Sequence, residues 1–136
     1  MFRIVYTSRL DPAIGRAEIE AIVARAQARN KRDGITGAWL MRGRDCLSAL
    51  EGPPKAVRET TERIWDDRRH SEFRLHEMKP TDDRHFEGWD LEFLDVDDQS
   101  LARIEAHPGL SWLCRFAGGA EAFVSQGLPS EPDPNS

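Results

Sequence analysis

The sequence predicts an α+β fold, a ferredoxin-like sandwich in which a five-stranded mixed sheet carries two helices on one face, with further helices at the C-terminus. The main observation is the order of the hydrophobic patterns, which is strand, helix, strand, strand, helix, strand, strand. The length agrees, because 136 residues suit one domain with a single core. A hydrophobic content of 39% is ordinary for a globular protein and excludes a disordered or collagen-like chain.

The first strand and the first helix come directly from these patterns. Apolar residues alternate along the first ten residues, and Val5 on the opposite side makes this a strand buried on both faces. A helix follows Asp11-Pro12 and is expected to end near Asn30, before Asp33-Gly34. Its inner face is marked by residues at helical spacing: Ile19, Ile22, Val23 and Ala26.

The middle of the chain predicts a hairpin and a second helix. Residues 35–41 and 46–52 are apolar runs joined by a short turn that contains glycine, which is typical of a hairpin. Pro53-Pro54 can open a helix, because proline is tolerated in the first turn. This helix is expected to end around Arg69-His70, with an inner face of Val57, Thr61, Ile64 and Trp65.

Two more strands are expected, at residues 73–78 and 89–94, with Trp89, Leu91 and Phe93 on one face of the last. Residues 1–97 are predicted to form the main domain, 98–126 a helical extension and 127–136 a mobile tail. The extension is rich in large apolar residues: Leu101, Ile104, Trp112, Leu113, Phe116 and Phe123. They pack on the open face of their own sheet or form a subunit interface.

Charge and cysteine content exclude several functions. A net charge of −5 argues against a nucleic-acid-binding protein, which normally presents a basic face. No membrane is expected as a partner, because no stretch approaches the length of an apolar membrane span. Cys46 and Cys114 have no ligand-like neighbours and are expected to be reduced, buried thiols in a cytoplasmic protein. The four histidines do not cluster and no catalytic motif occurs, so neither a metal site nor catalytic residues are expected.

Three residues indicate a polar pocket between the helices and the sheet. Tyr6, the only tyrosine, lies on the apolar face of a central strand, where its hydroxyl needs a partner. Asn30 lies at the end of the first helix, where it is either a cap or a ligand contact. Trp89 is either an ordinary core residue or part of the pocket wall.

Five segments resemble the BLUF family, the flavin-binding blue-light sensor domains. They follow one another in family order and with family spacing over about residues 2–95. The segments are RIVYTSR at 3–9, AQARNKRDGITG at 26–37, LEG at 50–52, RIWDDRRH at 63–70 and RHFEGWDLEF at 84–93.

The resemblance implies a flavin, usually FAD, between the two helices and the sheet. Tyr6 matches the tyrosine that gives an electron and a proton to the excited flavin. Asn30 matches the asparagine that bonds the flavin ring, and Arg29 precedes it where the family usually has Asn or His. Arg63 and Asp67 match positions on the second helix that help to hold the flavin.

Three positions depart from the family pattern. Ser48 stands where a glutamine bridges the tyrosine and the flavin in the light switch. Leu91, two residues after Trp89, replaces a methionine, and Cys46 replaces a bulky aromatic residue. Serine keeps a hydroxyl but loses the amide and most of its reach, so we expect flavin binding without a lasting red-shifted state.

The leading hypothesis is a stand-alone, non-enzymatic photoreceptor that binds FAD, or FMN in its place. Its signal would pass through residues 98–126 to a protein partner or a second subunit of a homo-oligomer. A second hypothesis is a BLUF-like interaction module that has lost its flavin, for which Ser48 is the main support. A third is a small ferredoxin-like enzyme, which would need a substrate cleft with a base of tuned pKa.

Overall fold

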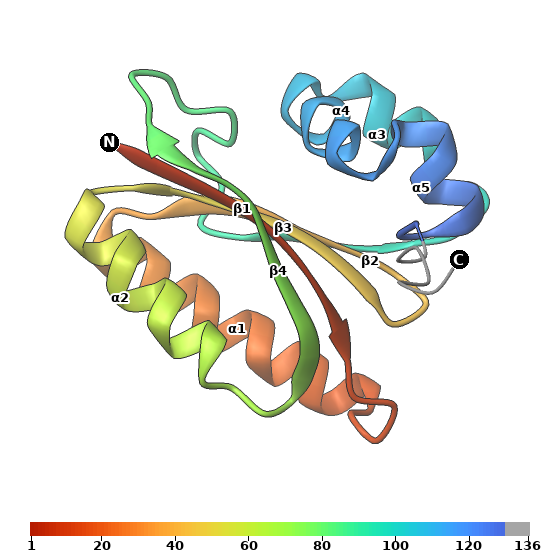
Figure 1. The fold of residues 1–136 in the computed structure, drawn as a ribbon, viewed down its shortest axis with the longest axis horizontal. Coiled ribbons are helices and arrows are strands. Elements are labelled where there is room, and N and C mark those ends of the chain that lie inside the picture. The colour runs from red at the N-terminus through yellow and green to blue at the C-terminus, as the bar shows by residue number, and fades with distance from the viewer. Residues whose placement is uncertain (130–136) are drawn as a thin grey trace, which may run out of the picture.

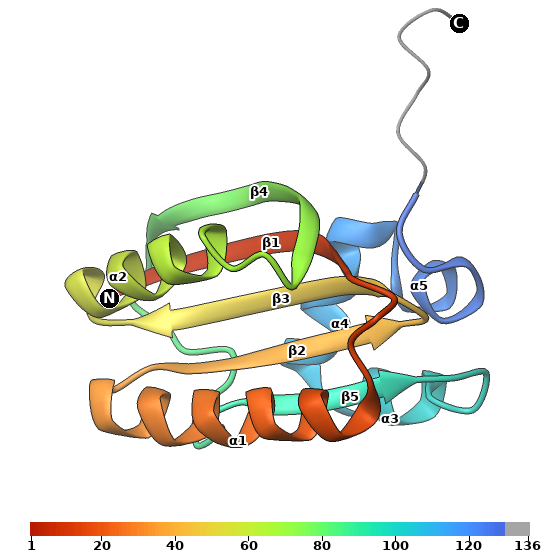
Figure 2. The ribbon, with the colours of Figure 1, turned by 90° about the horizontal axis from the view of Figure 1, so that it is seen from below.

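A computed structural model describes residues 1–129 of the chain. The helices and strands are β1 (Phe2–Leu10), α1 (Arg16–Asp33), β2 (Thr36–Arg42), β3 (Asp45–Gly52), α2 (Pro54–Trp65), β4 (His70–Pro80), β5 (Glu92–Val96), α3 (Leu101–Ala106), α4 (Pro108–Cys114), the short 3-10 helix η1 (Arg115–Ala117) and α5 (Ala120–Gln126). They form three layers: α1 and α2 on one face of the sheet, the sheet itself, and α3 to α5 on the other face (Figures 1 and 2).

The strand order across the sheet is β4-β1-β3-β2-β5. All neighbours are antiparallel except β2 and β5, which run parallel. This arrangement follows when two crossover helices each return the chain to a parallel strand two places away, with an antiparallel strand between them. The predicted ferredoxin-like sandwich with one additional strand is confirmed.

Strand β1 is buried on both faces, as the sequence predicts. Ile4 packs in a cluster with Val57 of α2, whereas Val5 packs in a larger cluster on the other face. Successive side chains of a strand point to opposite faces, so neighbouring β1 residues belong to different layers.

Helix α1 ends where the chain turns left-handed. It runs to Asp33, three residues beyond Asn30, and Gly34 caps it with a φ of 73° and an N–H that donates to the Asn30 carbonyl. Glycine adopts this conformation without the steric cost that other residues meet, which explains the stop. Asn30 is therefore an interior residue of the last turn, and the hypothesis that it caps the helix is wrong.

Helix α2 is shorter than predicted, and its inner face includes the expected Val57 and Ile64 but neither of the other two predicted residues. It begins at the expected proline but ends at Trp65, whose side chain is 62% exposed. Thr60 is buried in place of the predicted Thr61. The end comes early because the Asp67 carboxylate accepts a hydrogen bond from the backbone N–H of Arg69, which turns the chain toward β4.

The last strand also starts later than predicted, at Glu92. Trp89 was expected to share a face with Phe93, and this prediction is wrong. The Trp89 ring lies in the larger core cluster and stacks on His107 at a centroid distance of 4.0 Å. Phe93 lies on the opposite face of the sheet, against Trp39. Residues before Glu92 do not pair in the sheet, so the period of two cannot be extended back to Trp89.

The C-terminal helices cover the second face of the sheet, which confirms the first of the two alternatives for this segment. Leu113 and Phe123 are fully buried with Leu40 and Leu47 of the sheet. The domain boundaries remain predictions, and the predicted mobile tail lies, beyond Pro129, outside the described residues. None of the helices in residues 1–129 has the length and apolar character needed to cross a membrane.

Candidate functional site: a cavity between the helix pair and the sheet

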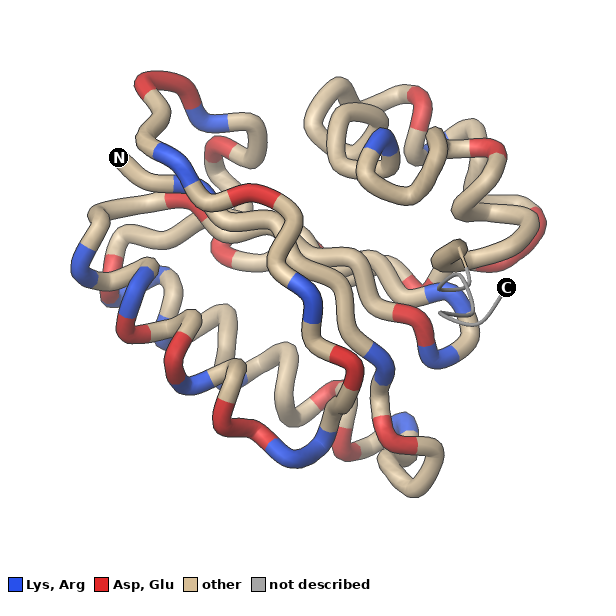
Figure 3. Tube along the Cα trace, in the orientation of Figure 1, with Lys and Arg blue, Asp and Glu red and all other residues tan. Residues whose placement is uncertain are grey.

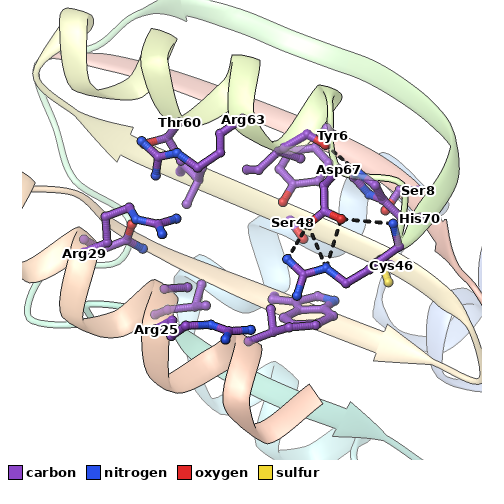
Figure 4. A pocket seen from close by; sticks show the side chains of 18 of the residues that line it. Tyr6, Ser8, Arg25, Arg29, Cys46, Ser48, Thr60, Arg63, Asp67 and His70 are labelled. Atoms are coloured by element: carbon purple, nitrogen blue, oxygen red, sulfur yellow. Dashed lines mark hydrogen bonds and ion pairs between the residues drawn. The ribbon is translucent and has the colours of Figure 1, made fainter. Parts of the chain in front are cut away.

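A cavity of about 390 Å³ lies between α1, α2 and the sheet (Figure 4). This volume falls within the range usual for sites that hold small molecules and cofactors. Seven of the eight residues predicted to contact a cofactor line it: Tyr6, Arg29, Asn30, Ser48, Arg63, Asp67 and Leu91.

The floor of the cavity consists of alternate residues of the central strands. Tyr6 lies opposite Ser48 in the β1–β3 pairing, and Ser48 lies opposite Trp39 in the β2–β3 pairing. Paired residues of antiparallel strands point to the same face, so these three side chains form one row across the floor. Ser8 and Cys46, which lie opposite each other, form the next row, because each lies two residues along its strand from Tyr6 or Ser48.

The Tyr6 hydroxyl is held in its protonated form. Burial raises the pKa of Tyr6 to about 12, while a hydrogen bond with the Ser48 side chain opposes the rise. The ring of Tyr6 stacks on Phe73 of β4, with centroids 5.0 Å apart. Tyr6 therefore lines the cavity as a fixed, neutral phenol at any pH at which the protein would work.

Asn30 connects the cavity to the segment that precedes β5. Its side chain is 3% exposed, and Nδ2 donates to the Asp90 carbonyl at 2.7 Å. One turn earlier, Nε2 of Gln27 donates to the Leu91 carbonyl at 2.9 Å. These bonds place Leu91 in the cavity wall and leave the Asn30 side-chain carbonyl available to another partner.

The helices contribute positive charge. Arg25 and Arg29 of α1 and Arg63 of α2 line the cavity. The pKa of Arg29 is lowered, first by burial and then by the charge of Arg63. Over the described residues, basic and acidic residues are interspersed along the chain (Figure 3), whereas these three arginines gather at the cavity.

Asp67 is engaged within the protein. Its carboxylate accepts hydrogen bonds from the guanidinium and the backbone N–H of Arg69, and the guanidinium bond lowers the pKa of Asp67. Asp67 is thus ionised and fixes Arg69 in the cavity wall, beside His70. A ligand could therefore bond the Asp67 carboxylate only at oxygen lone pairs that do not already accept hydrogen bonds from Arg69.

Trp89 is the one predicted contact that the structure places elsewhere. It packs with the C-terminal helices on the far side of the sheet and does not line the cavity. Its backbone carbonyl accepts a hydrogen bond from Gly37 N–H at 3.0 Å, which ties the backbone of Trp89 to the start of β2. We therefore correct the assignment of Trp89 as a cofactor contact.

Several lining residues were missed, although simple periodicity indicates them. Ser8 is two residues from Tyr6 on the same strand, and Arg25 is four residues before Arg29 on the same helix. Thr60 is one turn before Arg63 on α2. Trp39 could have been found from the register of the hairpin, which places it opposite Ser48.

The lining suits a flat apolar molecule with a polar edge, as a flavin ring is. Apolar side chains such as Leu50, Ile64 and Leu91 provide the walls. The buried hydroxyl of Thr60 has no hydrogen-bond partner among the described residues, so a polar group is missing at that point of the wall. Within residues 1–129 no group of three or more His, Cys, Asp or Glu side chains is arranged to hold a metal ion.

Comparison with known proteins gives a family match over most of the chain. The family model described as sensors of blue-light using FAD, BLUF, matches residues 1–92. Among solved structures, the dark state of the BLUF protein BlrB is 29% identical with a TM-score of 0.70, covering 79% of this chain and 80% of BlrB. No match was found among curated protein sequences.

Other similar structures belong to longer proteins. A bacterial light-regulated adenylyl cyclase is 27% identical with a TM-score of 0.67 over 69% of this chain, which spans 28% of the cyclase. BlrP1 of Klebsiella pneumoniae, solved with FMN and cyclic diGMP, is 26% identical with a TM-score of 0.69 over 93% of this chain and 35% of BlrP1.

BlsA, solved in a ground and a photo-activated state, shares only the fold at this level of identity. Its photo-activated structure is 18% identical, with a TM-score of 0.69 and 97% of each chain covered. With the family model, the sheet order and the cavity in agreement, the chain belongs to the BLUF family, the sensors of blue light that use FAD.

Proposed function

We propose that this chain binds a flavin nucleotide, FAD or FMN, in the cavity between α1, α2 and the sheet. The observation that supports this most strongly is the convergence of Tyr6, Ser48 and Asn30, from three separate elements, on one cavity of about 390 Å³. A flavin ring combines large apolar faces with a polar edge, and this lining offers both.

Each side chain has a role in holding the ligand. Asn30 bonds the polar edge of the ring through the amide groups that Asp90 leaves free. Arg29 and Arg63 stand at the part of the cavity formed by helix residues, where their charge favours the phosphates of FAD or FMN. Leu91 packs against the ring, and Asp67 acts through Arg69, which it orients.

A bound flavin supplies the absorption of blue light and the capacity to accept an electron. Tyr6 supplies a neutral phenol that holds its proton, because its pKa is about 12. Ser48, directly opposite in the sheet, provides a single hydroxyl to that phenol. A single short hydroxyl cannot both hold the phenol and reach across a cavity as the longer amide of glutamine does.

We infer that the light response lacks a lasting red-shifted state. Purified protein supplemented with FAD is expected to show a flavin absorption band that does not shift to the red after blue illumination. Ser48→Gln is expected to restore the shift, and Ser48→Ala, which removes the hydroxyl without adding an amide, is the matched control. A stable red shift in the unaltered protein would contradict the inference.

We propose a sensory role, without catalysis, for this chain. The signal would leave through α3 to α5, which cover the second face of the sheet, toward a protein partner or a second subunit. A cytoplasmic location is proposed as well, in keeping with the two free, buried cysteines.

The second candidate is an interaction module without flavin, and Ser48 is the residue that favours it. The two candidates differ in one measurement. The measurement is a titration of FAD or FMN with the protein, followed by flavin fluorescence. No change in fluorescence supports the module, whereas fluorescence quenching that reaches a plateau as protein is added supports the sensor.

A further inference from the structure

Among residues 1–129, Thr60 carries the one buried hydroxyl of the cavity wall that has no hydrogen-bond partner. It lies on the inner face of α2, is 7% exposed and lines the cavity. Its Oγ1 forms no hydrogen bond with any residue among 1–129. The next residue, Thr61, behaves differently, because its hydroxyl donates to the Val57 carbonyl one turn earlier at 2.7 Å.

This difference indicates that the hydroxyl of Thr60 is free to bond a group that lies outside α2. A helical threonine commonly satisfies its hydroxyl by bonding the carbonyl four residues before it, as Thr61 does. A buried hydroxyl that makes no bond lowers the stability of the folded state, since it has given up its bonds with water. Valine has the same shape and avoids that cost, so packing alone does not explain a threonine at this position.

The position of Thr60 limits which part of a ligand it can meet. Figure 4 shows it beside Arg63, at the end of the cavity away from His70 and Cys46. Arg25 and Arg63 are exposed, so the charged part of a nucleotide would lie near solvent with them. The buried Thr60 faces whatever part of the ligand is enclosed.

We propose that the Thr60 hydroxyl forms a hydrogen bond with the polar edge of the flavin ring, at a ring carbonyl or ring nitrogen. This inference rests on the proposed function, because it requires a flavin in the cavity. Together with Asn30, Thr60 then provides ring contacts from both helices, one from α1 and one from α2. The ring edge would then give Oγ1 the hydrogen-bond partner that it lacks among residues 1–129.

The test is Thr60→Val, with Thr61→Val as the matched control on the same helix. Thr60→Val is expected to weaken FAD binding about tenfold in a fluorescence titration, in line with the loss of one well-formed bond. In the flavin-free protein the same change is expected to leave the melting temperature unchanged or raise it. Thr61→Val removes a bond that exists without ligand, so it is expected to lower the melting temperature and leave FAD affinity unchanged.

Two further measurements separate the proposal from its alternatives. Thr60→Ser is expected to retain most of the affinity, because it keeps the hydroxyl. Lumiflavin, which has the ring but no ribityl or phosphate, is expected to lose the same factor of about ten with Thr60→Val. A loss confined to FAD and FMN would move the contact to the chain of the nucleotide and overturn the assignment to the ring.

The remaining outcomes also decide the matter. Equal FAD affinity in Thr60→Val and in the unaltered protein overturns the proposal while leaving flavin binding intact. A fall in both melting temperature and affinity, as large in the flavin-free state as for Thr61→Val, identifies a purely structural role. Failure of the unaltered protein to bind any flavin instead overturns the proposed function itself.

Discussion

Tyr6 is the only tyrosine in the chain, so its ionisation can be followed directly. Its pKa of about 12 in the folded state lies above the ordinary value of 10.0. Absorbance at 295 nm in the folded protein is therefore expected to titrate near pH 12, and in urea-unfolded protein near pH 10.

The same shift makes stability depend on pH. Between pH 10 and 12 the unfolded chain has lost the Tyr6 proton and the folded protein has kept it. The free energy of unfolding should then fall by about 1.4 kcal/mol per pH unit as pH rises. Tyr6→Phe, which cannot ionise, isolates this contribution, and an identical alkaline slope in both proteins would contradict it.

Glu51 is a second residue whose surroundings predict a large effect. It is fully buried, its Oε2 meets Arg3 in a salt bridge at 3.2 Å, and its carboxylate accepts the backbone N–H groups of His85 and Phe86. Glu51→Gln removes the negative charge that faces Arg3 and turns an amide donor toward backbone donors. We expect a loss of about 3 kcal/mol in urea unfolding.

The control for Glu51 is the exposed Glu59. Glu59→Gln is expected to change the free energy of unfolding by less than about 0.5 kcal/mol, as surface substitutions usually do. A loss below about 1 kcal/mol for Glu51→Gln would show that water or a rearranged loop compensates Arg3.

At this scale the sequence identified residues whose position follows from a regular element. Tyr6 and Asn30 followed from the patterns of the first strand and the first helix, whereas Arg29, Ser48, Arg63 and Asp67 were found through their match to family positions. Trp89 lies in the irregular segment before β5, where no period applies, and its face was wrong. Thr60 was missed because the apolar pattern of α2 favours Thr61 equally well.

Among the elements, α4 packs on the sheet through buried residues such as Leu113 and has one further attachment, through the aromatic ring of Trp112. The Trp112 ring contacts the guanidinium of Arg3, 4.9 Å from its centroid, and stacks on the ring of His85 at 4.3 Å. The Arg3 side chain in turn donates to the Asp83 carbonyl at 2.7 Å. One ring therefore joins α4 to both the sheet and the segment before β5.

Trp112→Ala is expected to loosen α4 and residues 81–86 together. The free energy of unfolding should fall by about 2 kcal/mol, less than for a fully buried tryptophan. Hydrogen exchange should accelerate in α4 and in residues 81–86 before it does in α1. Trp65→Ala, at a residue that is 62% exposed, is the control and should leave exchange in α4 unchanged. Uniform acceleration across all helices would argue against a local attachment.

The types and order of the elements were predictable, whereas several of their ends were not: β4 runs from His70 to Pro80 instead of 73–78, α2 ends early and β5 starts late. The ends of α1 and the hairpin follow local residues such as Gly34, whose backbone requirement is written in the sequence. The end of α2 depends on the Asp67 side chain bonding Arg69, and the start of β5 depends on pairing with β2. The first is a side-chain hydrogen bond and the second is a tertiary contact, and neither can be predicted from the spacing of hydrophobic residues.

For the whole molecule, the C-terminal helices complete the larger core. The residues of the sheet that they cover are fully buried: Val5, Ala38, Leu40, Leu47 and Ala49. A chain that ends at residue 97 would expose this apolar surface to water. Residue 97, where the boundary was predicted, lies between the end of β5 and the start of α3.

Truncation tests this dependence. A variant of residues 1–97 is expected to bind the dye ANS strongly and to lose a cooperative melting transition, or to precipitate on expression. A variant of residues 1–129 keeps every described contact and should melt as the full chain does. Cooperative melting of the shorter variant near the temperature of the full chain would show that the first layer and the sheet are sufficient.

The alternation along β1 has a consequence for how such a protein can change over time. The Tyr6 side chain lies on the cavity side of the sheet, whereas its neighbours Val5 and Thr7 face the opposite side. There Oγ1 of Thr7 forms a hydrogen bond with Nε2 of His76 at 2.8 Å. Two sets of side chains that face different layers are thus interleaved in a single strand. A replacement such as Ser48 can change the lining of the cavity without disturbing the face that α3 to α5 cover, so the two sides of the sheet can change independently of each other.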